Sequence, residues 1–242
     1  MKLHIYSDIN LRYLDFADPV DETPPLVDAV IVAGNISTDV KRSLLFQETL
    51  GQHLIPIFIN FGSLEFSKGS YCLDSMRSAH LRYSVKKDTN CYYKHNINVV
   101  LPELKLDVLP MFGWPTFGSQ EELDATSLGK INLEVVWGMH YDEHGVAINS
   151  FDPYPTKWYR INELHQLEQD VLKSWLSDQH VTENKKVLIV GNDYNTLINS
   201  MDLTNVVVVT PNAVPRDAIL NNGRLVSNPG SGALPRSNVL VI

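Results

Sequence analysis

The sequence lacks an excess of basic residues. It has 20 Lys and Arg against 28 Asp and Glu in 242 residues, a formal net charge of -8. A negative net charge opposes binding to nucleic-acid phosphates and to anionic membrane surfaces, and no stretch gathers Lys and Arg into a basic stripe. We therefore expect no general nucleic-acid binding and no membrane association.

Cysteines and long apolar runs are also scarce. The only cysteines are Cys72 and Cys91, and the residues after Met1 contain no apolar run of signal-peptide length. We expect a cytoplasmic protein with free thiols, because disulfides persist mainly in oxidising compartments. Internal repeats are absent, and 44% hydrophobic residues suit a single domain over residues 1–242.

Short apolar segments predict buried β-strands. The clearest is Ala29–Ala33, which is apolar throughout, β-branched at its centre and followed by Gly34. Because it is fully apolar, we expect both of its faces to be buried. Further strands are expected at Lys2–Tyr6, Ile55–Asn60, Ile97–Leu101, Leu104–Phe112, Lys186–Val190, Val206–Val209, Arg224–Gly230 and Val239–Ile242.

Helical periodicity appears at two places. Residues 38–53 have apolar side chains at near-helical spacing between two strands, which predicts a βαβ unit. Arg160–His180 has an apolar stripe that includes Leu167 and Trp175, whereas His165 beside the stripe is expected to be a packing or surface residue. An alternating α/β chain of this kind carries ligands at the carboxyl ends of its strands.

Glycine, asparagine and acidic residues follow the strands at five places. These stretches are Asp8–Asn10 (D-I-N), Gly34-Asn35 (G-N), Gly62–Glu65 (G-S-L-E), Gly191–Asn195 (G-N-D-Y-N) and Thr210–Ala213 (T-P-N-A). With the framing stretches His95–Ile97 and Ser227–Gly230, they resemble in order the five motifs of the calcineurin-like metallophosphoesterase superfamily, in particular its small bacterial branch. The resemblance implies a four-layer α/β/β/α sandwich of two mixed sheets flanked by helices.

The resemblance also implies where a metal-dependent active site would lie. In that superfamily the Asp, Asn and His residues of the motifs hold two divalent cations, which polarise a phosphate ester and activate a water molecule. Of the charged metal ligands only Asp8 remains here, whereas Asn35 replaces the bridging carboxylate and Leu64 replaces the leaving-group acid. The positions that correspond to the vestigial site are Asp8, Asn10, Asn35, Ser63, Leu64, Glu65, Asn192, Asp193, Pro211 and Ala213.

We accordingly expect no catalytic residue, no cofactor and no dinuclear metal centre. One carboxylate with neutral amides does not offset the dehydration of two dications. Asn10, Asn35 and Asn192 are expected to hydrogen-bond turn backbone. If a cation binds at all, it is a single weakly held divalent ion on Asp8, Asn35 and Asn192, with Asp193 as a minor candidate.

Three functions remain open. The favoured hypothesis is a pseudophosphatase that binds an unknown protein or small-molecule partner. The second is a phosphoesterase or nuclease with a reduced or relocated metal site around Asp8, Glu65, Asp193 or the pair His140 and His144, although flanking glycines favour a solvated loop for that pair. The third is a structural subunit of an assembly, and the sequence leaves the oligomeric state open.

Overall fold

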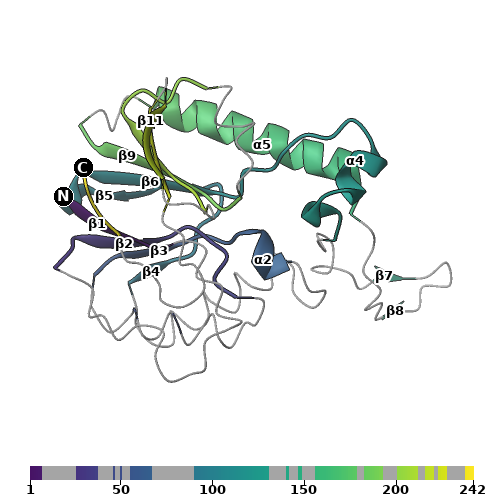
Figure 1. The fold of residues 1–242 in the computed structure, drawn as a ribbon, viewed down its shortest axis with the longest axis horizontal. Coiled ribbons are helices and arrows are strands. Elements are labelled where there is room, and N and C mark those ends of the chain that lie inside the picture. Colours follow the sequence, from purple (N-terminus) through teal and green to yellow (C-terminus); the bar gives the residue numbers. More distant parts are fainter. Residues whose placement is uncertain are drawn as a thin grey trace.

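The architecture consists of two packed β-sheets with a long helix on the outer face of one of them (Figure 1). The computed structural model describes residues 1–6, 26–37, 46, 50, 55–66, 90–130, 140–141, 147–148, 156–178, 183–192, 201–211, 216–220, 223–227 and 238–242. Both sheets are mixed, as expected, because each has a parallel interior and an antiparallel strand at one or both edges.

The five-stranded sheet has the order β13-β1-β2-β3-β4. Its strands are β1 Lys2–Tyr6, β2 Ala29–Val32, β3 Ile57–Ile59, β4 Cys91–Tyr92 and β13 Asn238–Val241. The first four are parallel, and β13 runs antiparallel to β1. All side chains of β2 and β3 are buried, which explains why these strands are continuous apolar runs and do not alternate with polar residues.

The six-stranded sheet has the order β11-β12-β10-β9-β6-β5. Its strands are β5 Val99–Leu101, β6 Leu106–Met111, β9 Lys185–Val190, β10 Val206–Val209, β11 Arg216–Leu220 and β12 Gly223–Ser227. The four inner strands are parallel, and the edge strands β5 and β11 are antiparallel to their neighbours. The carboxyl ends of β6, β9 and β10 therefore meet at one edge.

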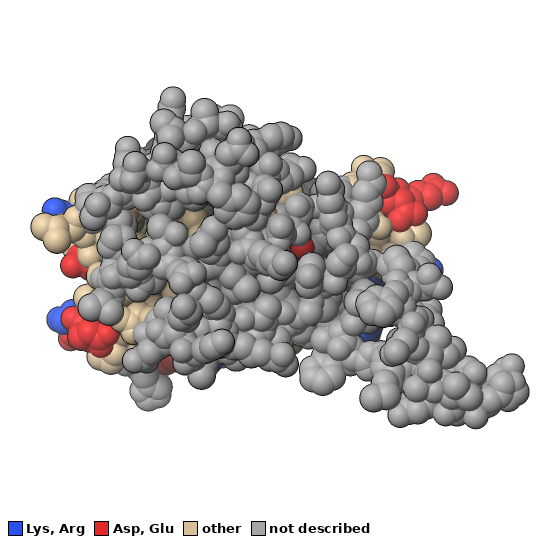
Figure 2. Space-filling model, turned by 90° about the horizontal axis from the view of Figure 1, so that it is seen from below, with Lys and Arg blue, Asp and Glu red and all other residues tan. Residues whose placement is uncertain are grey.

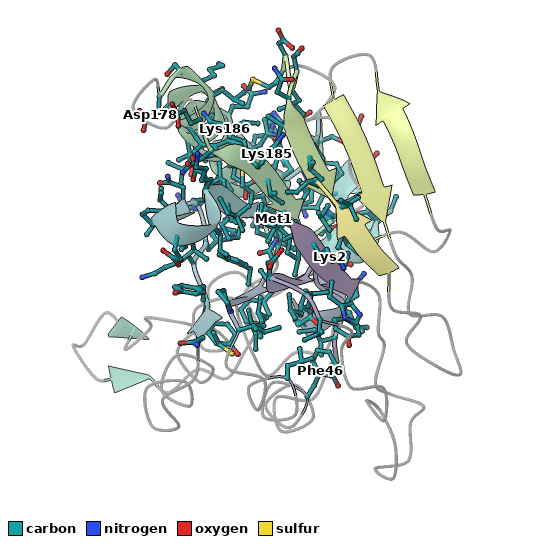
Figure 3. All side chains as sticks on the ribbon, turned by 90° about the vertical axis from the view of Figure 1, so that its left-hand side faces the viewer. Met1, Lys2, Phe46, Asp178, Lys185 and Lys186 are labelled. Carbon is teal, nitrogen blue, oxygen red and sulfur yellow. The ribbon has the colours of Figure 1, made fainter. Side chains whose placement is uncertain are left out.

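Three apolar clusters fill the layers. One lies between the sheets and includes Ile5, Ile31, Phe58, Val108, Ile189 and Val209. A second joins the outer face of the five-stranded sheet to Phe46 and Leu50, the described residues of the expected helix 38–53, and a third joins β6, β9 and β10 to the long helix. Figure 3 shows Phe46 beyond the five-stranded sheet, on the side away from Asp178 at the helix end.

The long helix α5 spans Trp158–Ser177, so it begins two residues before the expected start. Its buried residues are Ile161, His165, Glu168, Leu172 and Trp175. The expected apolar stripe was wrong at one position, because Leu167 is 52% exposed while the neighbouring Glu168 is fully buried. Glu168 can replace an apolar residue there because backbone N–H groups pair with its carboxylate.

Short elements complete the described chain. They are α2 Ser63–Phe66, α4 Gln120–Asp124, the 3₁₀ helices η1 Pro102–Leu104 and η2 Ser127–Lys130, and the paired strands β7 His140–Tyr141 and β8 Ala147–Ile148. The prediction of a loop at His140 is wrong at that residue, which lies in a two-residue strand paired with β8. The strand expected over Leu104–Phe112 begins later, because Pro102 starts η1 and Lys105 ends it in a left-handed conformation.

Cys91 is a free thiol, as expected, and Cys72 lies outside the described residues. Within the described ranges, no helix has both the length and the apolar character needed to cross a membrane. At one end of the face shown in Figure 2, described Lys and Arg side chains lie next to Asp and Glu side chains.

Candidate functional site

The loops that follow β2, β3 and β9 meet at glycines. A Cβ atom on Gly34, whose φ is +106°, would lie 2.6 Å from the backbone nitrogen of Gly62. A Cβ on Gly62 would lie 2.4 Å from Asn35 Oδ1 and 2.7 Å from the carbonyl oxygen of Gly191. These contacts leave no room for a side chain, so glycine brings the second, third and fourth motif stretches together.

Glu65 holds two of these loops in place. Its carboxylate is 3% exposed and accepts hydrogen bonds from the backbone N–H groups of Asn35 (3.1 Å), Ile36, Ser37 (3.1 Å) and Gly62 (2.7 Å). Burial raises the pKa of Glu65 to about 7, and the N–H groups of Gly62, Ile36 and Ser37 lower it in part. This carboxylate is therefore a loop clamp, because both of its oxygens are bound to backbone N–H groups.

Asn35 and Leu64 face each other across the two loops. Asn35 Oδ1 accepts a hydrogen bond from the Leu64 backbone N–H at 3.0 Å, and Asn35 has a left-handed backbone with φ of 54°. The prediction that Asn35 bonds turn backbone is confirmed. Ser63 and Leu64 are half-buried in the first turn of α2, so both side chains lie at the strand ends where the motif alignment placed them.

The side chain of Asn192 differs from that of Asn35 in its hydrogen bonding. It is 9% exposed, and its side-chain Nδ2 is buried without a hydrogen-bond partner in the described part of the chain. Its backbone carbonyl accepts a hydrogen bond from Thr210 Oγ1 at 3.2 Å, which links the fourth motif stretch to the fifth, where Pro211 is buried. The Asn192 Nδ2 makes no backbone hydrogen bond among the described residues, and the expected bond to turn backbone stays a prediction for its Oδ1.

Several predicted site residues cannot be placed. Asp8, Asn10, Asp193, Ala213 and His144 lie outside the described residues, as does the side chain of His140. Among the residues that are described, no three His, Cys, Asp or Glu side chains gather where they could hold a metal ion.

Comparison with known proteins gives a fold match without a sequence match. No family model and no curated protein matches this chain. The crystal structure of the phosphopantetheinyl hydrolase of Mycobacterium tuberculosis matches with a TM-score of 0.57 at 14% identity, over 94% of this chain and 89% of the other. A second solved structure matches with a TM-score of 0.54 at 13% identity, over 94% and 90% of the two chains.

The chain has the metallophosphoesterase fold. The match covers nearly the whole chain and agrees with two mixed sheets whose strand ends meet at one site. The resemblance and the fold class expected from the sequence are thereby confirmed. At this level of identity the comparison establishes the metallophosphoesterase fold and leaves the chemistry to the residues present.

The described part of the site does not fit the metal cluster that the metallophosphoesterase fold implies. Both oxygens of Glu65 accept backbone hydrogen bonds, and Asn35 Oδ1 accepts one from Leu64. Asn192 is a neutral amide, and a dinuclear centre requires several anionic or imidazole ligands. We therefore derive no catalytic step through metal at these residues.

Asn60 has a structural role at this site that the sequence did not reveal. It is 3% exposed at the end of β3, and its Nδ2 donates to the carbonyls of Met111 (2.5 Å) and Ile189 (3.2 Å) in the other sheet. The same Met111 carbonyl accepts a bond from the Gly191 N–H at 2.9 Å. Asn60 thus joins the two sheets directly beneath the motif loops. The sequence signal is only a polar residue at the end of an apolar run.

Glu168 repeats the arrangement of Glu65 on the other sheet. From α5 it accepts the N–H groups of Phe112, Gly113 and Trp114 at 2.8 to 2.9 Å, and His95 Nε2 lies 3.7 Å from its carboxylate. Burial raises the pKa of Glu168 to about 7. One helical turn earlier, the buried His165 bonds the Trp114 carbonyl through Nδ1 at 2.5 Å. The helix therefore fixes the loop that follows β6.

Proposed function

We propose that this chain is a pseudophosphatase, a protein with the metallophosphoesterase fold that binds a partner or ligand and does not hydrolyse phosphate esters. The proposal rests on the hydrogen bond between Asn35 Oδ1 and the Leu64 N–H. Where the superfamily has a bridging carboxylate and a leaving-group acid, this chain has an amide bound to backbone and a side chain with no proton to give.

The donor set supports the same proposal. Two dications held close together repel each other, and anionic ligands must compensate for this repulsion and for lost hydration. Glu65 is saturated by backbone N–H groups, so within the motif alignment only Asp8 remains to supply a negative ligand at a position of the cluster. The Asp193 carboxylate aligns beside a ligand position and not at one.

A turnover assay tests the proposal. p-Nitrophenyl phosphate, bis(p-nitrophenyl) phosphate and a phosphopantetheinyl ester, chosen because of the matched hydrolase, are incubated with Mn²⁺, Mg²⁺ or Zn²⁺. We expect the wild type to show no more hydrolysis than Asp8→Ala, and elemental analysis after purification without added metal to show no stoichiometric transition metal. Metal-dependent hydrolysis that Asp8→Ala abolishes, or two tightly bound ions per chain, would contradict the proposal.

A second candidate is a reduced site that holds one hard cation. The observation in its favour is the buried Asn192 Nδ2 without a partner among the described residues, because the amide turned by 180° about its last bond presents its oxygen at the same place. In that case Mg²⁺ or Mn²⁺ raises the melting temperature of the wild type, and Asn192→Leu abolishes the increase. If added cations leave the melting temperature unchanged, this candidate is excluded.

A further inference from the structure

The loop after β6, residues 112–118 and here called the β6 loop, is bound to α5 through its backbone. The Glu168 carboxylate accepts the N–H groups of residues 112–114 at 2.8 to 2.9 Å. One and a half turns earlier on the helix, the Asn162 amide both accepts from the N–H and donates to the carbonyl of Phe117 at 2.9 Å. The position of the β6 loop therefore depends on side chains of α5.

The β6 loop begins beside the motif loops. Met111, the last residue of β6, accepts hydrogen bonds at its carbonyl from Asn60 Nδ2 and from the Gly191 N–H. Residue 112, the next in the chain, is already bound to Glu168. A change in how Glu168 holds the β6 loop is thus transmitted over one residue to the base of the candidate site.

His95 lies against the same carboxylate. Its Nε2 is 3.7 Å from Glu168 Oε1, and the two side chains are 10% and 0% exposed. The next residue, Asn96, donates its backbone N–H to the Pro110 carbonyl at 2.9 Å, which fixes the His95 segment along β6. An imidazole and a carboxyl group are therefore held together in a largely dry environment.

The remaining groups around Glu168 do not bring a charge. His165, one helical turn earlier, has the bonding pattern of a neutral imidazole: Gln169 Nε2 can only donate to its Nε2, and its Nδ1 donates to the Trp114 carbonyl. Residues 112–114 have no ionisable side chain. Among the described residues, no Lys or Arg lies within 4 Å of the Glu168 carboxylate, so His95 is its one candidate counter-charge there.

The protons of the two groups are coupled. Burial raises the pKa of Glu168 to about 7, and imidazoles ordinarily titrate in the same range. A protonated His95 compensates an ionised Glu168, whereas a neutral His95 leaves a buried negative charge that only N–H groups stabilise. Exposure of that carboxylate to water, by separation of the β6 loop from α5, then becomes more favourable.

We propose that His95 and Glu168 form a proton-responsive contact, which holds the β6 loop on α5 while the pair carries a proton and loosens it when both groups have lost theirs. This contact lies outside the five motif stretches. It does not depend on whether the protein hydrolyses phosphate esters.

A titration followed by ¹H–¹⁵N spectra from about pH 5 to 9 tests the contact. The backbone N–H of Gly113 bonds the Glu168 carboxylate and reports its ionisation, while that of Phe117 bonds a side chain that does not titrate and serves as the internal reference. His95→Gln removes the imidazole. Asp170→Asn is the matched control, because this exposed carboxylate lies on the same helix and bonds Gln166.

We expect His95→Gln to raise the pH midpoint of the Gly113 signal by about 1 unit, because a nearby positive charge favours the ionised carboxylate. Glu168→Gln should lower the midpoint of the His95 ring signals by a similar amount, since the coupling is reciprocal. Asp170→Asn should leave both midpoints unchanged. An unchanged Gly113 midpoint in His95→Gln overturns the proposal, and this result decides even if Glu168→Gln does not fold.

Hydrogen exchange tests the loosening itself. After correction for the intrinsic pH dependence of exchange, protection of the amides of residues 112–114 should fall relative to that of the β9 amides as the wild type loses the proton of the pair. Near neutral pH, His95→Gln should show lower protection of the same amides than the wild type. Protection that stays constant relative to β9 across the titration would show that the contact is only structural, which also overturns the proposal.

Discussion

The side-chain oxygen of Asn35 accepts a hydrogen bond from the backbone N–H of Leu64, 29 residues later in the chain, at 3.0 Å. This bond joins the loops after β2 and β3 and uses the amide of a residue for which the sequence resemblance predicts the place of a bridging carboxylate. Asn35 also has a positive φ of 54°, which asparagine tolerates better than most residues. The residue is therefore suited to the loop structure as it stands.

A pair of variants separates the two effects of Asn35 on the free energy of unfolding, that of its side-chain hydrogen bond and that of its left-handed backbone. Asn35→Ala loses the hydrogen bond, at about 1 kcal/mol, and adds left-handed strain of about 1–2 kcal/mol. Asn35→Gly loses the bond without this strain. We expect urea denaturation to give a larger loss of unfolding free energy for Asn35→Ala than for Asn35→Gly, by at least about 1 kcal/mol. Equal losses would show that the left-handed backbone at this position costs nothing.

Replacing Glu65 by Gln should destabilise the fold strongly. Each Glu65 oxygen accepts two backbone N–H groups, so either orientation of a Gln amide directs its NH₂ group at two donors. Leaving buried donors unsatisfied costs about 1–3 kcal/mol each, and we expect a loss of roughly 3 kcal/mol or more in urea denaturation.

Glu122→Gln is the matched control for this prediction. The exposed Glu122 carboxylate accepts one backbone N–H, from Gly118 at 2.7 Å. Water can replace that contact, so this variant should lose less than about 1 kcal/mol. A similar loss in both variants would contradict the clamp assigned to Glu65.

The two buried glutamates should make stability fall as pH rises from about 4.5 to 7. Burial raises the pKa of both Glu65 and Glu168 from 4.5 to about 7, so in this window the folded chain binds more protons than the unfolded chain. Their contribution to stability is complete below pH 4.5 and is lost as pH approaches 7. Denaturation at several pH values should show that Glu168→Gln reduces this slope by at most roughly 1.4 kcal/mol per pH unit. An unchanged slope would contradict the raised pKa of Glu168.

His4 should have the opposite pH dependence. It is fully buried in β1, stacks on Tyr6 with ring centres 4.3 Å apart, and neither imidazole nitrogen has a partner in the described chain. Burial lowers its pKa from 6.5 to about 4, so the unfolded chain binds more protons between these values. The contribution of His4 to stability is complete above pH 6.5 and is lost as pH falls toward 4.

His4→Phe tests this dependence. The substitution keeps a stacking ring and removes the two buried polar atoms, which should stabilise the fold at pH 7 by about 1 kcal/mol or more. It should also remove the His4 contribution to acid sensitivity between pH 4 and 6.5, measured by thermal unfolding. Greater acid sensitivity in the variant would show that His4 is not buried in its neutral form.

Apolar pattern and turn chemistry predicted most of the architecture. Ala29–Ala33 predicted a doubly buried strand, and the structure places it in the middle of the five-stranded sheet. Short edge strands were missed, because β4 has two residues and β11 has a mixed sequence, R-D-A-I-L, without a clear run. Such strands form through pairing with a neighbour, and a single sequence carries little signal for that pairing.

The sequence predicted where the candidate site lies better than it predicted the hydrogen bonds within it. The glycines after the strands correctly placed the second, third and fourth motif stretches together. The roles of Glu65 and Glu168 were not predictable, because their partners lie about 30 and 55 residues away in the chain. Burial of a glutamate depends on contacts with backbone groups that are distant in the sequence. The helical period of α5 predicted that Leu167 is buried, whereas the buried residue is its neighbour Glu168.

The clamp formed by Glu65 also explains how the loops can keep their shape while their side chains change. Its carboxylate binds only main-chain N–H groups, and every non-proline residue supplies such a group. Substitutions at most neighbouring positions therefore change the side chains that these loops present without removing the bonds that shape the loops. In evolutionary terms, backbone architecture and side-chain chemistry at these strand ends are separable, because the shape of the loops persists while their side chains vary.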